Sequence, residues 1–260
     1  MKIAVASDLH TEWNTFDIAS CDAELVFLVG DIGSGTDGVE WTIQQFNKFN
    51  NTKMVILIPG NHDFYGCNDV YEQLDTMKKI AEGTKVHILY NEFIDYKTYR
   101  ILGSTLWSDF KLHGNQTLGM INSIAFKPGS NNSRHSIADF DKIGWKNSGN
   151  ITAEIMVEEN KKAVDFIFDN LNNEMTNVVL THFPPAAIIS YRNSIYNPDD
   201  PAAPYFTNTL DNNIGYSDIK FWFYGHNHDS NRYEIAETTL IGWMKGYNKS
   251  NDFKLYEMEI

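Results

Sequence analysis

The sequence predicts an α/β domain in which helices cover the sheets. Short apolar runs, each ending in a polar loop, occupy Lys2 to Ala6, Ala23 to Val29 and Lys53 to Ile58, and segments with helical spacing alternate with them. Near-continuous apolar strands of this kind are typical of sheets buried on both faces. The chain has 260 residues and is 42% hydrophobic, enough for one large core.

The elements follow in order along the chain. Apolar residues recur at helical spacing in residues 38–49, 69–81 and, most clearly, 154–171, which predicts three amphipathic helices. Further apolar runs predict strands, and the last of them alternates like a half-exposed strand. These strands are expected at 86–89, 100–102, 177–180, 220–224, 232–236, 238–243 and 253–260.

Two segments lack a clear pattern. Residues 105–150 are rich in Gly, Asn and Ser, and we expect a loop-rich insert with a short helix around 116–126. Five of the seven prolines lie in 184–204, so about 184–218 is expected to be a Pro-rich extended loop. Long irregular segments are usually functional or mobile. Without a repeat or a linker, residues 1–260 are predicted to form one domain.

Composition limits the possible partners. The net charge is −13, which disfavours long nucleic acids and anionic membranes but leaves room for a small phosphorylated substrate. Residues 1–10 lack the apolar core of a signal peptide, and no apolar run is long enough to span a membrane. Cys21 and Cys67 are too few for a disulfide framework. We therefore expect a cytoplasmic protein; its oligomeric state stays open.

Polar side chains of metal-binding types follow five predicted strands. In parallel α/β sheets such strand ends gather at one edge, where ligands bind. The D-x-H and H-x-H spacings put both side chains of each pair on the same side of the backbone. Carboxylate, imidazole and amide ligands together suit Mn, Fe, Zn or Ni. The residues are Asp8 and His10; Asp31; Asn61, His62 and Asp63; His182; and His226 and His228.

Glycines precede three of these clusters. Gly30, Gly60 and Gly225 each stand directly before a candidate ligand. A residue without a Cβ allows a sharp turn and a close approach of the backbone to an ion. The clusters therefore look like parts of one compact site.

The ordered set D-x-H, G-D, G-N-H-D, T-H and G-H-x-H resembles the calcineurin-like metallophosphoesterase superfamily. The motifs extend from residue 8 to residue 228. The G-x-T-L-W segment at 103–107 and the T-H-x-P-P segment at 181–185 are similar to a bacterial and phage-type branch. The resemblance implies a four-layer α/β/β/α sandwich of two mixed sheets flanked by helices.

The resemblance also implies two divalent metal ions, with Mn favoured. Asp31 would bridge an ion held by Asp8, His10 and His228 and an ion held by Asn61, His182 and His226. A metal-bridging hydroxide would attack phosphorus. His62 would donate a proton to the leaving oxygen, and Asp63 would orient His62 and raise its pKa.

Other interpretations stay open. Singly, Asp8 and Asp31 are consistent with helix caps, Asn61 and Asp63 with structural work in a turn, and the histidines among the ligands with ordinary partly buried residues. The D-x-H start with an intact His62 resembles the branches of the family that cleave diesters, with phosphomonoester hydrolysis as the alternative. A silent partner-binding scaffold and a metal-dependent amide hydrolase or oxygenase are the other classes. Trp107 is suited either to stacking on a base or to core packing.

Overall fold

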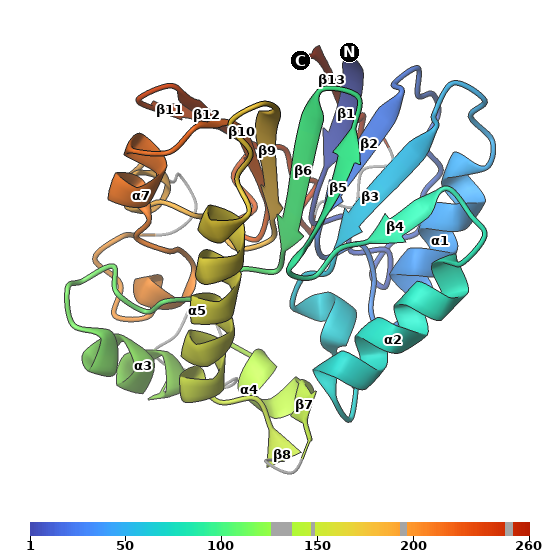
Figure 1. The fold of residues 1–260 in the computed structure, drawn as a ribbon. Coiled ribbons are helices and arrows are strands. Elements are labelled where there is room, and N and C mark those ends of the chain that lie inside the picture. Colours follow the sequence, from blue (N-terminus) through green and yellow to red (C-terminus); the bar gives the residue numbers. More distant parts are fainter. Residues whose placement is uncertain (126–136, 147–148, 193–196, 248–251) are drawn as a thin grey trace.

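A computed structural model of the chain describes residues 1–125, 137–146, 149–192, 197–247 and 252–260 (Figure 1). Its first sheet has five strands, four of them parallel, and the C-terminal strand pairs antiparallel with the N-terminal one. In spatial order the strands are β13 (Tyr256–Glu259), β1 (Lys2–Ala6), β2 (Leu25–Val29), β3 (Met54–Ile58) and β4 (Val86–Ile88).

The second sheet has six strands. Its four inner strands are parallel, and an antiparallel strand closes each edge. In spatial order they are β11 (Arg232–Ile235), β12 (Thr238–Gly242), β10 (Ile219–Tyr224), β9 (Thr176–Thr181), β6 (Tyr99–Ser104) and β5 (Glu92–Tyr96).

Strand alternation divides the core into three apolar layers. Ile3 and Val5 of β1 point between the sheets, where they join Val178 and Phe223 of the second sheet. The intervening Ala4 belongs to the cluster on the outer face of the first sheet. Both faces of the inner strands of each sheet are therefore buried, as the apolar runs predicted.

Helices cover the two outer faces, on opposite sides in Figure 1. The helices α1 (Asp37–Phe46) and α2 (Val70–Ala81) lie on the first sheet, and α5 (Ala153–Asp169) lies on the second. Asp69 caps α2 by accepting hydrogen bonds from two backbone amides, and Thr152 caps α5 by accepting one from the backbone N–H of Ile155. The arrangement is the four-layer α/β/β/α sandwich expected from the resemblance.

The two irregular segments contain more structure than expected. Residues 105–150 form α3 (Gln116–Ala125), α4 (Asp139–Lys142) and the small hairpin β7 (Gly144–Trp145) and β8 (Gly149–Asn150). The Pro-rich segment forms α6 (Ala187–Tyr191), η2 (Ala203–Tyr205) and α7 (Asp211–Gly215). These elements are at most five residues long except α3, so periodicity does not reveal them. Phe126, expected in the short helix, lies outside the described residues.

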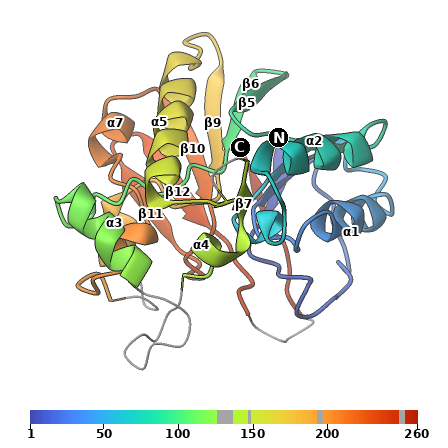
Figure 2. The same ribbon diagram turned by 90° about the horizontal axis from the view of Figure 1, so that it is seen from below.

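The N- and C-termini lie side by side at one end of the sandwich, and α4 lies at the other (Figure 1). In the view from that second end, α4 and β7 lie between α5 and α2 (Figure 2). Within the described ranges, no helix is both long and apolar enough to cross a membrane.

Candidate active site

The predicted ligands converge from both sheets. Asp8, Asp31 and Asn61 follow β1, β2 and β3 of the first sheet, whereas His182 and His226 follow β9 and β10 of the second. A parallel bridge between Ser7 and Met244 joins the two sheets beside the site. The ligands were expected at one edge of a sheet. Instead they lie where the strand ends of two sheets meet.

Asp8, His10 and His228 form a first set. The Nε2 atoms of His10 and His228 are 3.1 Å apart, and His228 Nε2 is 3.2 Å from Asp8 Oδ1. The Asp8 carboxylate also accepts hydrogen bonds from the backbone N–H of His226 at 2.9 and 3.1 Å. The carboxylate is therefore fixed while its Oδ1 still faces His228.

Asn61, His182 and His226 form a second set. Asn61 Oδ1 is 3.0 Å from His182 Nε2 and 3.2 Å from His226 Nδ1, and these two nitrogens are 3.3 Å apart. His182 Nδ1 lies 3.0 Å from the carbonyl oxygen of Val29. Because a carbonyl only accepts, Nδ1 carries a hydrogen, and in the neutral form of His182 the lone pair of Nε2 points toward the set.

Asp31 lies between the two sets. Its Oδ1 is 3.4 Å from His182 Nε2, and its Oδ2 is 3.8 Å from His10 Nε2. One carboxylate thus presents one oxygen to each set, the arrangement expected of a bridging ligand. A ring nitrogen of His62 also lies near Asp31. His10, Asp31 and His62 each offer one ligand atom, and these atoms lie within 4.8 Å of one another.

The spacing of the imidazole nitrogens fits a pair of metal ions. Nitrogens that bind one ion at about 2.1 Å, at octahedral or tetrahedral angles, lie roughly 3.0–3.4 Å apart. The pairs His10–His228 and His182–His226 are separated by 3.1 and 3.3 Å. The three groups of His and acidic residues suited to a metal within the described chain all belong to this site.

Five of the predicted ligands have left-handed backbone conformations. Asp8, His10, Asp31, His226 and His228 have φ values between 47° and 75°. This region is uncommon for residues with a Cβ and persists where the surrounding structure enforces it. Backbone strain is thus concentrated where strand ends turn sharply to aim side chains at one point.

The close approaches expected at the glycines are present. A Cβ on Gly60 would lie 2.2 Å from Asp31 Oδ1, and one on Gly30, where φ is +95°, would lie 2.1 Å from His182 Nδ1. A Cβ on Gly225 would lie 2.0 Å from Ser7 Oγ. Such distances exclude any side chain, so glycine is required for the ligands to meet.

Glu12 was missed by the sequence analysis. Its Oε1 is 3.0 Å from His10 Nδ1 and 3.1 Å from His62 Nδ1, so one carboxylate orients a predicted ligand and the predicted acid. In the sequence, Glu12 stands two residues after His10, so the D-x-H motif extends to D-x-H-x-E. That short separation is the signal that could have found Glu12, although the backbone here is left-handed at Asp8 and His10 and not an extended strand.

Of the two roles considered for Asp63, orienting His62 or holding a turn, the contacts of its side chain fit the second. Its carboxylate accepts hydrogen bonds from the backbone N–H groups of Asp31 at 2.9 Å and Gly60 at 2.8 Å, and from Gly33 at 3.4 Å. The carboxylate that contacts the His62 ring is Glu12. Asp63 therefore ties together the turns after β2 and β3, because its side chain turns inward from the short helix η1 (His62–Phe64).

Charge in the site shifts several pKa values. Burial opposes the charged form of His182, but the neighbouring Asp31 carboxylate raises its pKa to about 9. Burial also opposes charge on His62, whose pKa is raised to about 9 by Asp31 and by its contact with Glu12. Burial and the nearby His182 lower the pKa of His226 well below its usual range. Without metal, protons on some imidazoles offset the acidic ligands, and metal binding displaces them.

Two cavities adjoin at this site. One, of about 380 Å³, is lined by Asp31, Asn61, His226 and His228, and the other, of about 670 Å³, is lined by Glu12 and Ser34. Both are lined by a shared wall of four residues, two of which, Trp13 and Tyr65, are aromatic. That wall consists of Trp13, His62, Tyr65 and Lys142.

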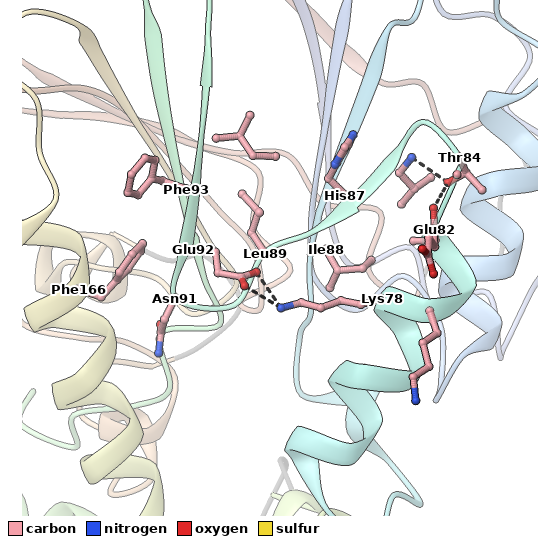
Figure 3. A pocket seen from close by; sticks show the side chains of 15 residues that line it. Lys78, Glu82, Thr84, His87, Ile88, Leu89, Asn91, Glu92, Phe93 and Phe166 are labelled. Carbon is pink, nitrogen blue, oxygen red and sulfur yellow. Dashed lines mark hydrogen bonds and ion pairs between the residues drawn. The ribbon is translucent and has the colours of Figure 1, made fainter.

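A larger cavity, of about 790 Å³, lies elsewhere, between α2 and the edge strands β4 and β5 (Figure 3). The ion pair between Lys78 and Glu92 crosses it at 2.8 Å. The residues that line it include none of the predicted ligands. Trp107 lines none of these three cavities; it is buried in the core and donates to Tyr90 Oη at 3.0 Å, so core packing is its role.

A family model described as calcineurin-like phosphoesterase matches residues 1–230. Among solved structures, the chain is similar to phosphopantetheinyl hydrolase (PptH) from Mycobacterium tuberculosis, with 17% identity, a TM-score of 0.72, and coverage of 95% of this chain and 89% of that one. A putative 5′-nucleotidase from Staphylococcus aureus shares 11% identity at a TM-score of 0.46, over 93% of this chain and 48% of that one. No protein with a curated description matches the sequence.

The matched residues contain all seven predicted ligands, and the family fold implies a dinuclear divalent metal centre where the two sets meet. The sequence motifs, the sandwich and the converging ligand sets agree with one another. The chain belongs to the calcineurin-like phosphoesterase family.

Proposed function

We propose that this protein hydrolyses a small phosphodiester or nucleotide with the help of two divalent metal ions. The observation that carries the proposal is the pair of ligand sets joined by Asp31, with His62 beside them. Asp8, His10, Asp31 and His228 would hold one ion, and Asp31, Asn61, His182 and His226 the other. Among the suitable metals Mn²⁺ is our first choice, with Fe, Zn and Ni as alternatives.

When bound, such a metal pair supplies an activated water and offsets the charge of the phosphoryl oxygens. The chain itself supplies the proton for the leaving group. Glu12 holds His62 through Nδ1, so Nε2 is the nitrogen available to donate to the leaving oxygen as the P–O bond breaks. His62 therefore acts as the general acid, and Glu12 sets its orientation.

The adjoining cavities support a diester over a monoester. A diester carries two substituents on its phosphorus. A phosphate at the ligand sets would lie in the cavity of about 380 Å³, and His62 belongs to the wall that this cavity shares with the cavity of about 670 Å³. The leaving substituent then extends past His62 between Trp13 and Tyr65. The net charge of −13 disfavours a long polyanion, which fits a small substrate.

The test compares leaving groups. With Mn²⁺, we expect wild type to hydrolyse bis-p-nitrophenyl phosphate faster than p-nitrophenyl phosphate. On a cyclic nucleotide, whose leaving group is an alkoxide, His62→Ala is expected to lower kcat by about 10²–10⁴-fold. The loss on bis-p-nitrophenyl phosphate should be smaller, because a nitrophenolate leaves without a proton. A phosphopantetheinyl compound belongs in the screen, since a structural neighbour is named for that group.

Preference for p-nitrophenyl phosphate would favour the monoesterase alternative. An absence of turnover in every metal would favour a partner-binding scaffold. The complete ligand set speaks against the scaffold, and the Asn61 amide among the ligands speaks against an amide hydrolase or oxygenase. Asp31→Ala and His182→Ala serve as controls that should lose both metal and activity.

A further inference from the structure

The buried carboxylate of Asp139 lies beside the second ligand set and connects side chains from three separate segments of the chain. It lies on α4 and is 1% exposed. Three side chains donate hydrogen bonds to it: Asn61 through Nδ2 at 2.9 Å, Tyr65 through its hydroxyl at 2.8 Å, and Tyr205 through its hydroxyl at 2.5 Å. Asp139, Tyr65 and Tyr205 belong to none of the sequence motifs described above.

The contact with Asp139 determines which way the Asn61 amide points. An amide has a donor end and an acceptor end, and a carboxylate takes the donor end. With Nδ2 held by Asp139, Asn61 Oδ1 faces His182 Nε2 at 3.0 Å and His226 Nδ1 at 3.2 Å. Only the oxygen end of the amide is suited to bind a cation, so this orientation decides whether Asn61 serves as a ligand.

The same junction links the second set to the two segments that cover it. Asp139 belongs to the 105–150 segment, and Tyr205 belongs to the Pro-rich segment. Tyr205 and Phe206 also pack on the His226 ring, with centroids 5.4 and 5.6 Å away. The first set has other supports, Glu12 on His10 and Tyr247 on His228.

We propose that Asp139 is a positioning residue that orients Asn61 and thereby couples the second metal position to both covering segments. The first position does not depend on it. The two ions are then held unequally: loss of Asp139 weakens the ion bound by Asn61, His182 and His226 and spares the ion bound by Asp8, His10 and His228. The inference rests on the proposed function only for the presence of two ions.

The experiment measures metal binding rather than hydrolysis. Full-length metal-free protein is titrated with Mn²⁺ under equilibrium dialysis, and bound metal is counted by mass spectrometry. We expect two tight ions for wild type. Asp139→Ala should keep one and bind the second about 10- to 100-fold more weakly, as is typical when a partner of a metal ligand is removed.

Asp109 provides a matched control. It is another buried carboxylate that joins the same two segments, because it accepts hydrogen bonds from the Lys111 backbone and from the Thr209 backbone and hydroxyl. None of these partners is a predicted ligand. Asp109→Ala should therefore loosen the segments while both ions stay tightly bound. Equal loss of the second ion in both variants would overturn a specific role for Asp139.

Exchanging the amide of Asn61 and the carboxylate of Asp139 distinguishes a positioning role of Asp139 from a role in folding. Asn61→Asp alone sets two carboxylates against each other and should weaken the second ion. In Asn61→Asp/Asp139→Asn the new amide donates to the new carboxylate, and binding of the second ion should recover. A double variant no better than Asn61→Asp, or two tight ions in Asp139→Ala, would overturn the inference alone. Wild type without bound metal would overturn the proposed function as well.

Discussion

The Nε2 atoms of His10 and His228 lie 3.1 Å apart although 218 positions separate the two residues. When two neutral imidazoles face each other in this way, the lone pair of only one Nε2 can accept a hydrogen bond from the other ring. A metal ion between them would be bound by the lone pairs of both nitrogens. Under the proposed function, a metal ion bound here would join the first tenth of the sequence to its last eighth. The free energy of metal binding would then add to the stability of the fold.

Metal should raise the melting temperature. A ligand at about 100 times its Kd contributes about 2.7 kcal/mol, which corresponds to roughly 5–10 °C for a chain of this size. We expect that increase when Mn²⁺ is added to metal-free protein, measured by differential scanning fluorimetry, and its reversal by chelation. His228→Ala should show a smaller increase. An equal increase in melting temperature for wild type and His228→Ala would show that the stabilising ion binds elsewhere.

Gly60→Ala should abolish metal binding at Asp31, which lies between the two ligand sets. The added Cβ would lie 2.2 Å from Asp31 Oδ1 and 2.5 Å from the Asp31 backbone nitrogen, so Asp31 has to move. Bound Mn²⁺ is the measurement. Gly215→Ala is the control, since its Cβ meets Ile235 at an ordinary 3.6 Å. Two bound ions in Gly60→Ala would show that the turn adapts.

Glu12→Gln should reduce kcat on a phosphodiester about 10- to 100-fold, because the neutral amide holds the rings of His10 and His62 less firmly. Steady-state kinetics with saturating Mn²⁺ provide the measurement. Glu92→Gln breaks the Lys78 ion pair in the larger cavity and should leave kcat unchanged. If Glu92→Gln were the more damaging variant, the chemistry would belong to that cavity instead.

Asp63→Ala should act on stability before it acts on proton transfer. The change leaves the backbone N–H groups of Asp31 and Gly60 without their acceptor, and each buried unsatisfied group costs about 1–3 kcal/mol. Chemical denaturation of the metal-free protein measures the loss. Asp75→Ala, on the exposed face of α2, is the control. Unchanged stability together with a slower alkoxide-leaving reaction would restore Asp63 as the partner of His62.

The sequence was sufficient to predict that these side chains lie close together, because they stand at the ends of apolar strands. Asp8 and Asp31 follow the ends of β1 and β2 by two residues, and their neighbours match family motifs. Strand β5 was missed because it is a half-exposed edge strand with charged residues at Glu92 and Asp95, which hides its period. The helix over 154–171 was found with nearly its observed bounds, since its apolar face recurs over many turns.

The partners of the ligands were harder to predict. Glu12 left a local signal, because it continues a spacing already in use. Asp139 and Tyr205 left none, since Asp139 meets Asn61 and Tyr205 only after three distant segments pack together. For Asp63, proximity in sequence to His62 suggested a contact, but the turn of η1 directs the carboxylate to backbone amides. Adjacent residues on a tight turn face different partners.

The pairing of β13 with β1 has a consequence for how the protein is made. The first sheet contains both ends of the chain, and the Met1 amino group donates to the Ile260 carbonyl oxygen at 2.6 Å. On the ribosome, Asp8 and His10 emerge long before His226 and His228. The nascent chain therefore carries only five of the seven predicted ligands until His226 and His228 have been added, so neither predicted metal position can be completed before β10 has been synthesised.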